Sequence, residues 1–248
     1  MIAIITGATG DIGEEFVKNL IDEVDYIWAV GRSEAKLASL KSKYGEKIIP
    51  VRVDLSDKDD IFAFCRKIEN ENPSVKYLVN NAGTARMAPV AEFSLEEISD
   101  MLDINDKAAT LICRACLPYM AKDSYILNIA SASAFQPNPY IALYSASKAY
   151  LLSFTRSLNV ENEGINCIAV CPGWVDTKML PKNSNGKAIK YPGMVTAAKV
   201  VESALKDCKK GKDVSVCSFY YRYMRFLSKV TPHRTLMKFW VRGIRQYI

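Results

Sequence analysis

A tyrosine and a lysine stand four residues apart in the stretch YSASKAYLLSF, residues 144 to 154. If this apolar, alanine-rich stretch is a helix, Tyr144 and Lys148 lie one above the other on the same face. A phenol titrates near ~10 and a lysine amine near ~10.4, so neither is an ordinary proton carrier at neutral pH. An ammonium beside a phenol favours the phenolate and lowers the pKa of the tyrosine. An acid-base couple is therefore one interpretation of this spacing. The alternative is a structural helix face with a snorkelling lysine.

His233 is the only histidine in the chain. A single histidine excludes a multi-histidine zinc centre, and we expect no Ser-His-Asp triad in this chain. Cys113 and Cys116 form a CxxC, which is the spacing of some redox and metal motifs. No second pair or nearby histidine completes a metal site, so we interpret both cysteines as small buried residues and expect no metal. Acid-base chemistry in this chain must come from tyrosine, lysine or carboxylates.

The chain has 248 residues, of which 49% are hydrophobic and 24% are charged, with a formal net charge of +6. These values are typical of a globular protein with a sizeable core. The N-terminal stretch MIAIITGATG lacks a charged lead and a cleavage site, and we interpret it as a first strand rather than a signal peptide. No apolar run reaches the ~18 residues that a membrane-spanning helix needs. The odd number of cysteines, seven, favours a reducing compartment, so we expect a cytoplasmic protein.

The elements that position these residues follow from short β-branched runs that alternate with longer amphipathic segments. Strands are predicted at 2–6, 26–30, 48–53, 76–80, 125–130, 165–170 and 213–217. Helices are predicted at 12–22, 34–44, 57–71, 94–121, 142–161 and 197–208. This alternation predicts right-handed βαβ units and a single doubly wound α/β domain, in which a parallel sheet carries helices on both faces.

Ligands of such a sheet bind beyond the carboxyl ends of the strands. The first strand runs into TGATGDIG, residues 6 to 13, whose glycines would let the backbone approach a pyrophosphate at a helix N-terminus. The alternative is a tight strand-to-helix turn. The second strand ends in GRS, where Arg32 can accommodate the 2′-phosphate of NADP(H) and Gly31 leaves room beside it. The sequence therefore favours NADP(H) and leaves NAD(H) open; the alternative is a solvent-exposed arginine.

Polar residues also follow the third and fourth strands. Asp54 either accepts a hydrogen bond from the adenine amino group or opens the next helix, with Ser56 as the cap. The motif NNAG, residues 80 to 83, ends the fourth strand. Asn81 is predicted to tie neighbouring strand ends together. Ala82 and Gly83 would keep space for the ribose and the nicotinamide.

Three further features lie along the second half of this predicted edge. Asn105 stands in an otherwise apolar helix, and a buried amide needs partners, so it is either structural or holds an ordered water. Ser131 follows the fifth strand thirteen residues before the tyrosine, and Ser133 is a rival whose side chain we expect to point elsewhere. The sixth strand leads to CPGWVDT, residues 171 to 177. The backbone of this sharp turn and Thr177 could hold the carboxamide of a nicotinamide.

Together these motifs resemble the short-chain dehydrogenase/reductase family over about residues 1–217. NNAG, the serine after the fifth strand, the YSASK pair and PGWVDT stand in the order and spacing of the family. The resemblance implies a Rossmann-fold, NAD(P)-dependent oxidoreductase whose catalytic tetrad maps onto Asn105, Ser131, Tyr144 and Lys148. The implied cofactor contacts are Gly7, Thr9, Asp11, Ile12, Gly13, Arg32, Ser33, Asp54, Leu55, Asn81, Ala82, Gly83, Tyr144, Lys148, Pro172, Gly173, Val175 and Thr177.

The chain departs from the family in the glycine motif, where Asp11 occupies the position of the middle glycine and Gly10 precedes it. We expect Asp11 to cap the following helix, with its carboxylate turned away from the phosphates. The fold does not depend on this position.

The resemblance also implies the reaction, which is hydride transfer between the nicotinamide C4 and the carbon of a carbonyl or a secondary alcohol. Tyr144 would be the general acid in reduction and the general base in oxidation. Lys148 would lower the pKa of the tyrosine and hold the nicotinamide ribose. Ser131 would donate to the substrate oxygen, and Asn105 would support a water chain.

Residues 178–194 stand where the family places a mobile substrate lid. Aromatic residues near this segment and in the tail favour an apolar small-molecule substrate, such as a steroid or a fatty-acyl derivative. The family usually forms homodimers or homotetramers. Two alternatives stay open: a cofactor-binding regulator or membrane-associated scaffold with little turnover, and a 3-oxoacyl-carrier reductase whose basic tail attracts an acidic carrier protein.

The end of the chain is strongly basic. Residues 206–248 hold eleven Lys/Arg and two acidic residues, a net charge of +9, and we predict a basic amphipathic helical extension over 218–248 after the domain at 1–217. Its first helix would place three cations on one face and four apolar residues on another: Arg222, Arg225 and Lys229, and Phe219, Tyr223, Phe226 and Val230. Pro232 would end this helix.

Two alternatives describe this extension: packing on the domain or a partner subunit with a solvated basic face, or peripheral contact with an anionic membrane. Nucleic-acid binding is not expected, because the fold offers no element that reads bases.

Overall fold

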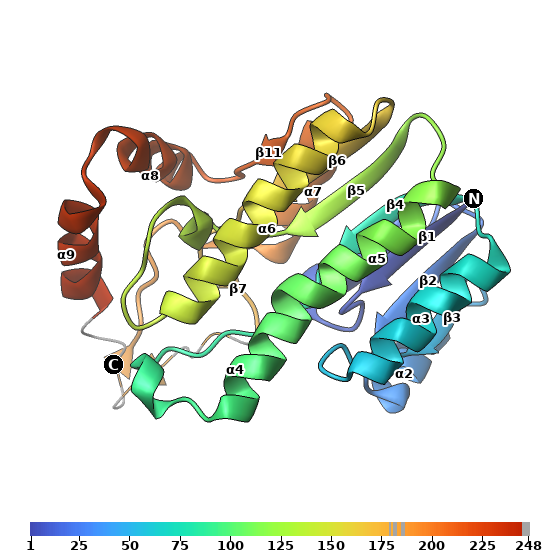
Figure 1. Ribbon diagram of the computed structural model, residues 1–248, viewed down its shortest axis with the longest axis horizontal. Coiled ribbons are helices and arrows are strands. Elements are labelled where there is room, and N and C mark those ends of the chain that lie inside the picture. Colours follow the sequence, from blue (N-terminus) through green and yellow to red (C-terminus); the bar gives the residue numbers. More distant parts are fainter. Residues whose placement is uncertain (179, 181–182, 185–186, 245–248) are drawn as a thin grey trace.

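A parallel sheet of seven strands forms the centre of the computed structural model, which describes residues 1–178, 180, 183–184 and 187–244. The strand order is β11-β6-β5-β4-β1-β2-β3 (Figure 1), and each neighbouring pair is parallel. The strands are β1 (Ile2–Thr6), β2 (Tyr26–Gly31), β3 (Ile48–Arg52), β4 (Val75–Asn80), β5 (Ser124–Ile129), β6 (Ile165–Val170) and β11 (Val214–Ser215). The order reverses beside β1, and ligands of such sheets bind outside the carboxyl ends of the strands at that point.

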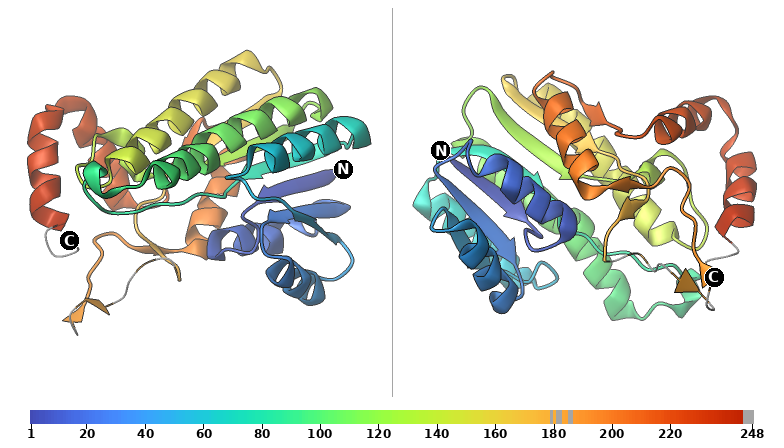
Figure 2. Two further views of the ribbon diagram at one scale, coloured as in Figure 1. Left: turned by 60° about the horizontal axis from the view of Figure 1, so that its bottom comes forward. Right: turned by 180° about the vertical axis from the view of Figure 1, so that it is seen from behind.

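Helices cover both faces of the sheet, as the front view of Figure 1 and the rear view of Figure 2 show. One face carries α1 (Asp11–Leu20), α2 (Glu34–Tyr44) and α7 (Ala197–Cys208). The other carries α3 (Lys58–Glu71), α5 (Ala108–Cys116) and α6 (Ala142–Glu161). All five residues of β1 are buried, as expected for a strand that is covered on both sides. The predicted doubly wound α/β fold is confirmed.

The long helix predicted at 94–121 is wrong as a single element. The chain forms α4 (Leu95–Leu102), a π-helical turn η2 (Asp103–Lys107), α5 and a 3₁₀ turn η3 (Leu117–Tyr119). Pro118 lacks the N–H that an α-helix needs, which accounts for the end of α5. The π-helical turn has no comparable signal in the sequence, and it brings Asn105 into the interior at 1% exposure.

Short elements complete the described residues. They are η1 (Val90–Glu92), η4 (Ala132–Phe135), the parallel pair β7 (Val175–Asp176) and β10 (Val195–Thr196), and the antiparallel pair β8 (Asn183–Ser184) and β9 (Lys187–Ala188). Residues 179, 181–182 and 185–186 of the segment 178–194, which is predicted as a substrate lid, lie outside the described residues.

The C-terminal helices are present and lie together at one end of the molecule, beyond β11 (Figure 1). They are α8 (Phe219–Val230) and α9 (His233–Ile244), and Pro232 separates them as predicted. Among the described helices, none combines the length and the apolar character needed to cross a bilayer. The division of the chain after residue 217 stays a prediction.

The turn between β1 and α1 is closely packed. Gly7 has φ +61°, a left-handed conformation that favours glycine. A methyl group on Gly13 would lie 2.1 Å from the carbonyl oxygen of Gly7, so α1 can approach the turn only if residue 13 has no side chain. A methyl group on Gly10 would lie at an ordinary 3.4 Å from the same oxygen.

We therefore expect Gly13→Ala to lower the free energy of unfolding by about 2–4 kcal/mol, since backbone must move to remove the clash. Gly10→Ala is the matched control and should change it by less than about 1 kcal/mol. Urea titrations of the two variants test this. Equal effects of the two substitutions would contradict the packing argument.

Candidate active site

The predicted catalytic residues meet at the carboxyl ends of β4 and β5. Lys148, on α6, extends its side chain into the interior, where it is 4% exposed. Its Nζ donates to the carbonyl oxygen of Ile129, the last residue of β5, at 2.9 Å. A methyl group on Gly83 would lie 3.2 Å from this Nζ and 3.3 Å from Oδ1 of Asn105. Gly83 therefore leaves the space that the lysine and the asparagine share.

The side chain of Ser131 lies within hydrogen-bonding reach of Tyr144, close enough to lower the pKa of the phenol. Ser131 is 7% exposed, lies two residues after the end of β5, and accepts from the backbone N–H of Ser133 at 3.1 Å. The phenol of Tyr144 is half-buried beside the lysine, whose Nζ lies 5.6 Å from the centre of the tyrosine ring. The hydroxyl, the phenol and the amine therefore form one group of proton-carrying side chains.

The expected direction of the tyrosine pKa is wrong in this structure. Burial raises the pKa of Tyr144, and the hydrogen bond with Ser131 lowers it only in part. Burial also lowers the pKa of Lys148 to about 8, while the charge of Asp106 opposes that shift. The ammonium is directed to the carbonyl of Ile129, and desolvation of the phenol is the larger effect.

Asn105 is fully partnered by protein groups. Its Oδ1 accepts from the backbone N–H of Thr84 at 2.9 Å. Its Nδ2 donates to the carbonyl of Thr84 at 3.0 Å and to Oγ of Ser147 at 3.1 Å. Asn105 was predicted either to be structural or to hold an ordered water. These hydrogen bonds to protein groups support the structural alternative. The amide ties the chain after β4 to α6 and thereby holds Gly83 beside Lys148.

Asp106 is a residue of this site that the sequence argument missed. Its Oδ1 is buried and has no hydrogen-bond partner among the described residues. Burial raises the pKa of this carboxyl to about 6, and the nearby Lys148 charge lowers it in part. The sequence did contain a signal for Asp106, because this residue is an acid in an apolar helix and directly follows the predicted tetrad asparagine.

The other end of the site is built on the turn after β1. Nδ2 of Asn81 donates to the carbonyls of Thr6 and Gly7 at 3.1 and 3.0 Å, so the predicted tie between strand ends is present. Thr6, another residue that the sequence argument missed, accepts from the backbone N–H groups of Asn81 and Ala82 at 3.0 and 3.1 Å. Its position as the last residue of β1, directly before a glycine, could have drawn attention to it. These bonds fix the glycine turn against the end of β4.

Arg32 lies at the end of β2 with an exposed side chain, and Ser33 caps α2 by accepting from the N–H of Lys36 at 3.4 Å. Thr9 lies close by, since a methyl group on Gly31 would be 3.8 Å from its Oγ1. Arg32 and Ser33 therefore follow directly on Gly31, which lies beside Thr9, at the strand end where a dinucleotide ribose is expected to bind.

The cap predicted for the third helix is wrong. Asp57, not Ser56, caps α3, by accepting from the N–H groups of Asp59 and Asp60. Asp54 instead accepts from the backbone and the hydroxyl of Ser56, at 3.0 and 2.7 Å. These hydrogen bonds, together with the charge of Arg32, lower the pKa of Asp54. The neighbouring Leu55 is buried in the core.

Asp11 does not cap α1, so that expectation is also wrong. The N-cap residue is Gly10, and no side chain caps the helix. Because Asp11 is the first residue of the helix, its carboxylate projects to the side and accepts from the backbone N–H of Lys178 at 2.8 Å. The residue that departs from the family motif thus connects the glycine turn to the chain that follows β7, while Ile12 packs on the core.

The turn at 172–177 contacts the C-terminal extension. A methyl group on Gly173 would lie 1.8 Å from the ring of Tyr221 on α8. The hydroxyl of Tyr221 donates to the carbonyl of Pro192 at 3.0 Å, and the N–H of Trp174 donates to it at 3.4 Å. Glycine at 173 is therefore explained by the tyrosine ring that packs on it, a contact between distant parts of the chain.

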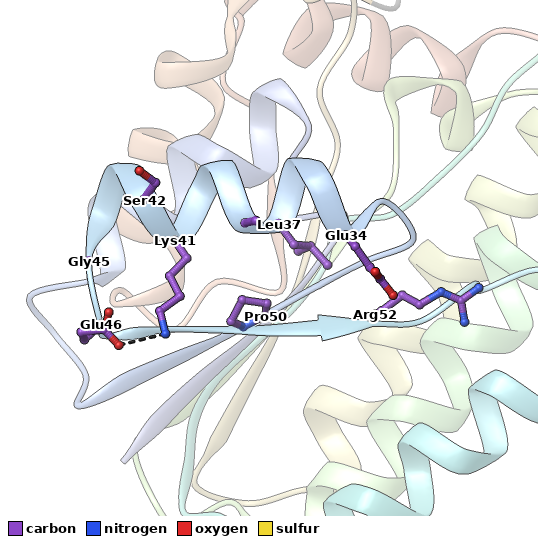
Figure 3. A pocket seen from close by; sticks show the side chains of 9 residues that line it. Glu34, Leu37, Lys41, Ser42, Gly45, Glu46, Pro50 and Arg52 are labelled. Carbon is purple, nitrogen blue, oxygen red and sulfur yellow. Dashed lines mark ion pairs between the residues drawn. The ribbon is translucent and has the colours of Figure 1, made fainter.

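The remaining residues of this turn are placed separately. The carbonyl of Pro172 accepts from the N–H of Ala132 at 2.7 Å, and Val175 is buried. Thr177 lines an open cleft of about 700 Å³ together with Asp11 and Lys178. A second open pocket of about 630 Å³, shown in Figure 3, lies between α2 and β3 and contains none of the predicted site residues.

The two cysteines of the CxxC are fully buried in α5. Burial raises the pKa of the Cys113 thiol to about 12, so this thiol is not reactive at neutral pH. The placement agrees with the structural interpretation of this motif.

Comparisons with known proteins place this chain in a family. Residues 1–188 match the family described as short chain dehydrogenase. An uncharacterized oxidoreductase of Staphylococcus epidermidis is 30% identical over 204 residues, which are 81% of this chain and 89% of the relative. The closed form of a serine dehydrogenase complexed with NADP⁺ is 30% identical, with a TM-score of 0.71 over 83% of this chain and 88% of that chain. A short-chain dehydrogenase/reductase of Burkholderia phymatum in complex with NAD shares the fold at 20% identity, with a TM-score of 0.77 over 91% of this chain and 92% of that chain.

The fold and the matched family define a nicotinamide-dependent oxidoreductase that acts on CH–OH or C=O groups. The chain belongs to the short-chain dehydrogenase/reductase family, as its motifs indicated.

The buried amine makes a prediction about stability. In the folded protein Lys148 has a pKa of about 8, below the ~10.4 of an unfolded chain. Below pH 8 both states carry the proton, and the folded state bears the full cost of the buried charge. We expect Lys148→Met to be more stable than the natural protein at pH 7, by about 2 kcal/mol. That difference should shrink as the pH rises from about 8 toward ~10.4.

Urea titrations at pH 7 and pH 10 measure this difference. The exposed Lys122→Met is the control and should show no change between the two pH values. A stability gain of Lys148→Met that is the same at both pH values would contradict the assigned pKa shift.

Proposed function

We propose that this chain is an NADP(H)-dependent oxidoreductase that interconverts a carbonyl and a secondary alcohol, with Tyr144 as the acid and base. The observation that carries the proposal is the group formed by Ser131, Tyr144 and Lys148 at the carboxyl ends of the central strands. The regulator or scaffold alternative is not favoured, because all four residues of the predicted tetrad are present and lie at one edge of the sheet.

The residues around the glycine turn fit a dinucleotide. Gly7 and Gly13 leave backbone close to the N-terminus of α1, where a pyrophosphate would be favoured. Arg32 presents an exposed guanidinium for a 2′-phosphate, and Lys148 would hold the nicotinamide ribose. The remaining contacts proposed are Thr9, Asp11, Ile12, Ser33, Asp54, Leu55, Asn81, Ala82, Gly83, Pro172, Gly173, Val175 and Thr177. When bound, the nicotinamide supplies the hydride.

The proton is managed by the side chains of the chain itself. Because burial raises the pKa of Tyr144, its phenol stays protonated at neutral pH. A protonated phenol is ready to donate to the oxygen of a carbonyl, and Ser131 would donate to the same oxygen. Lys148, with its pKa of about 8, can return a proton to the tyrosine at a pH close to neutral. These properties suit the proposed role of Tyr144 as the general acid in carbonyl reduction.

The relatives support this cofactor in part. The serine dehydrogenase binds NADP⁺, while the Burkholderia phymatum protein, which shares only the fold, binds NAD. The charge of Arg32 at the end of β2 supports NADP(H) as the preferred cofactor in this proposal. NAD(H) is the second candidate.

The substrate is proposed to be a small apolar carbonyl or alcohol compound, such as a steroid or a fatty-acyl derivative. Aromatic rings lie near the 172–177 turn. The ring centres of Trp174 and Tyr191 are 4.9 Å apart, and the ring of Tyr221 packs on Gly173. We also propose a cytoplasmic homodimer or homotetramer. Contact with a membrane is a separate proposal, because it concerns the C-terminal helices.

Tyr144→Phe tests the catalytic assignment. Removing the phenol hydroxyl should lower turnover of a ketone panel by roughly 10³-fold or more, since the phenol is the group proposed to transfer the proton to the substrate oxygen. NADPH binding, followed by its fluorescence, should stay unchanged. Tyr150→Phe is the control, because Tyr150 lies on the same helix but is exposed. Normal turnover in Tyr144→Phe would refute the assignment.

Arg32→Ala tests the cofactor assignment. The KM for NADPH should rise by about tenfold or more relative to that for NADH, because the charge-assisted bond to the 2′-phosphate is lost. Arg52→Ala is the matched control: Arg52 is exposed at the end of the next strand and pairs with Asp60 at 3.3 Å. If the ratio of the two KM values does not change in Arg32→Ala, the preference for NADP(H) is wrong.

A further inference from the structure

Helix α8 turns its apolar side to the solvent. Phe219 is 84% exposed, Tyr223 53%, Phe226 59% and Val230 61%. Their spacing of four, three and four residues places these side chains along one stripe of the helix. No residue of α8 is buried. We call this set, Phe219, Tyr223, Phe226 and Val230, the aromatic stripe.

The opposite side of α8 is fixed to the domain. Nε of Arg222 donates to the carbonyl of Val216 at 2.7 Å, and the guanidinium of Arg225 lies 5.4 Å from the centre of the Phe135 ring. Tyr221 packs on Gly173, as described above. Two of the three cations of the predicted basic face therefore contact the domain. The expected packing of the extension on the domain is therefore present for α8, but part of its basic face makes the contacts and is not fully solvated.

Helix α9 is also attached to the domain. Leu236 and Ile244 are buried, and Nε1 of Trp240 donates to the carbonyl of Pro139 at 2.8 Å. Its Phe239 is nonetheless 61% exposed. Figures 1 and 2 show α8 and α9 following one another at an angle at the same end of the molecule. Both helices therefore hold exposed aromatic side chains in fixed positions.

The positive charge of the C-terminal extension indicates which kind of partner binds the exposed surface of α8 and α9. Residues 218–248 contain seven Lys/Arg and no Asp or Glu. Lys229, Arg234 and Lys238 are exposed on α8 and α9. Two copies that met through this surface would bring cations against cations, which is unfavourable. An anionic lipid surface complements the charge, and tyrosine and phenylalanine suit the boundary between headgroups and acyl chains.

We propose that α8 and α9 dock the protein on an anionic lipid surface, with the aromatic stripe inserted among the headgroups and the exposed cations against the lipid phosphates. Neither helix could cross the bilayer, so this is attachment to one leaflet. Since Tyr221 fixes α8 to the turn at 172–177, docking would bring that turn close to the lipid. The attachment itself does not depend on the proposed reaction.

Co-sedimentation of the full chain with vesicles tests the proposal. One set of vesicles is phosphatidylcholine alone, and the other contains phosphatidylglycerol as well. We expect the protein to pellet with the anionic vesicles and to stay in solution with the zwitterionic ones. The double variant Phe219→Ser with Phe226→Ser should bind the anionic vesicles roughly tenfold more weakly, because less apolar area is inserted. Lys229→Glu with Lys238→Glu should weaken binding by a similar factor.

Matched controls separate this surface from general stickiness. Leu95→Ser with Val160→Ser removes two side chains that are 81% and 85% exposed elsewhere on the domain. Lys206→Glu with Lys210→Glu reverses two exposed charges outside α8 and α9. Both controls should bind as the natural protein does. Circular dichroism and NADPH-dependent turnover in solution establish that each variant is folded.

Three outcomes would overturn the proposal. In the first, the natural protein stays in solution with the anionic vesicles. In the second, loss of the two phenylalanines leaves binding unchanged, so that the stripe plays no part. In the third, vesicles are not bound and light scattering shows that the phenylalanine variant changes from a dimer to a monomer. The stripe would then be an interface between copies of this chain.

Discussion

The site depends on one buried cation. Lys148 is almost inaccessible to water, and its amine donates to the carbonyl of Ile129 at the end of β5. An ammonium in such a place is costly unless it is hydrogen-bonded, and the fold supplies the carbonyl, the nearby Asp106 carboxylate and the space left by Gly83. The strand end, the helix and the π-helical turn must all be in place before this amine can lie beside the tyrosine.

Hydrogen bonds between buried amides fix α6, the helix of Lys148, to the central strands. Nδ2 of Asn80, at the end of β4, donates to Oδ1 of Asn128 on β5 at 2.8 Å, and Nδ2 of Asn128 donates to Oγ1 of Thr155 on α6 at 2.8 Å. This chain of hydrogen bonds links two central strands to the helix that carries the acid-base pair. Buried polar groups of this kind are costly when unpaired, so they favour one register of helix on sheet.

The C-terminal extension joins the site through a contact between distant residues. Tyr221 occupies the position that a side chain at residue 173 would need, and its hydroxyl bridges the backbone of Trp174 and Pro192. The turn after β6 is thus held on one side by the domain and on the other by α8. A helix that is anchored in this way can keep its apolar stripe in the solvent, because its contacts with the domain are made by Arg222, Arg225 and Tyr221.

The sequence by itself determined the features that depend on neighbours along the chain. Periodicity located the strands and most of the helices, a spacing of four placed Tyr144 and Lys148 on one face, and the glycines of residues 6–13 located the turn after β1. Tertiary structure alone decided the break of the helix at 94–121, the hydrogen bond from Lys178 to Asp11, the direction of the Tyr144 pKa and the outward side of α8. Each of these depends on which distant groups exclude water or supply a partner. Desolvation and long-range contacts of this kind leave no mark in local spacing.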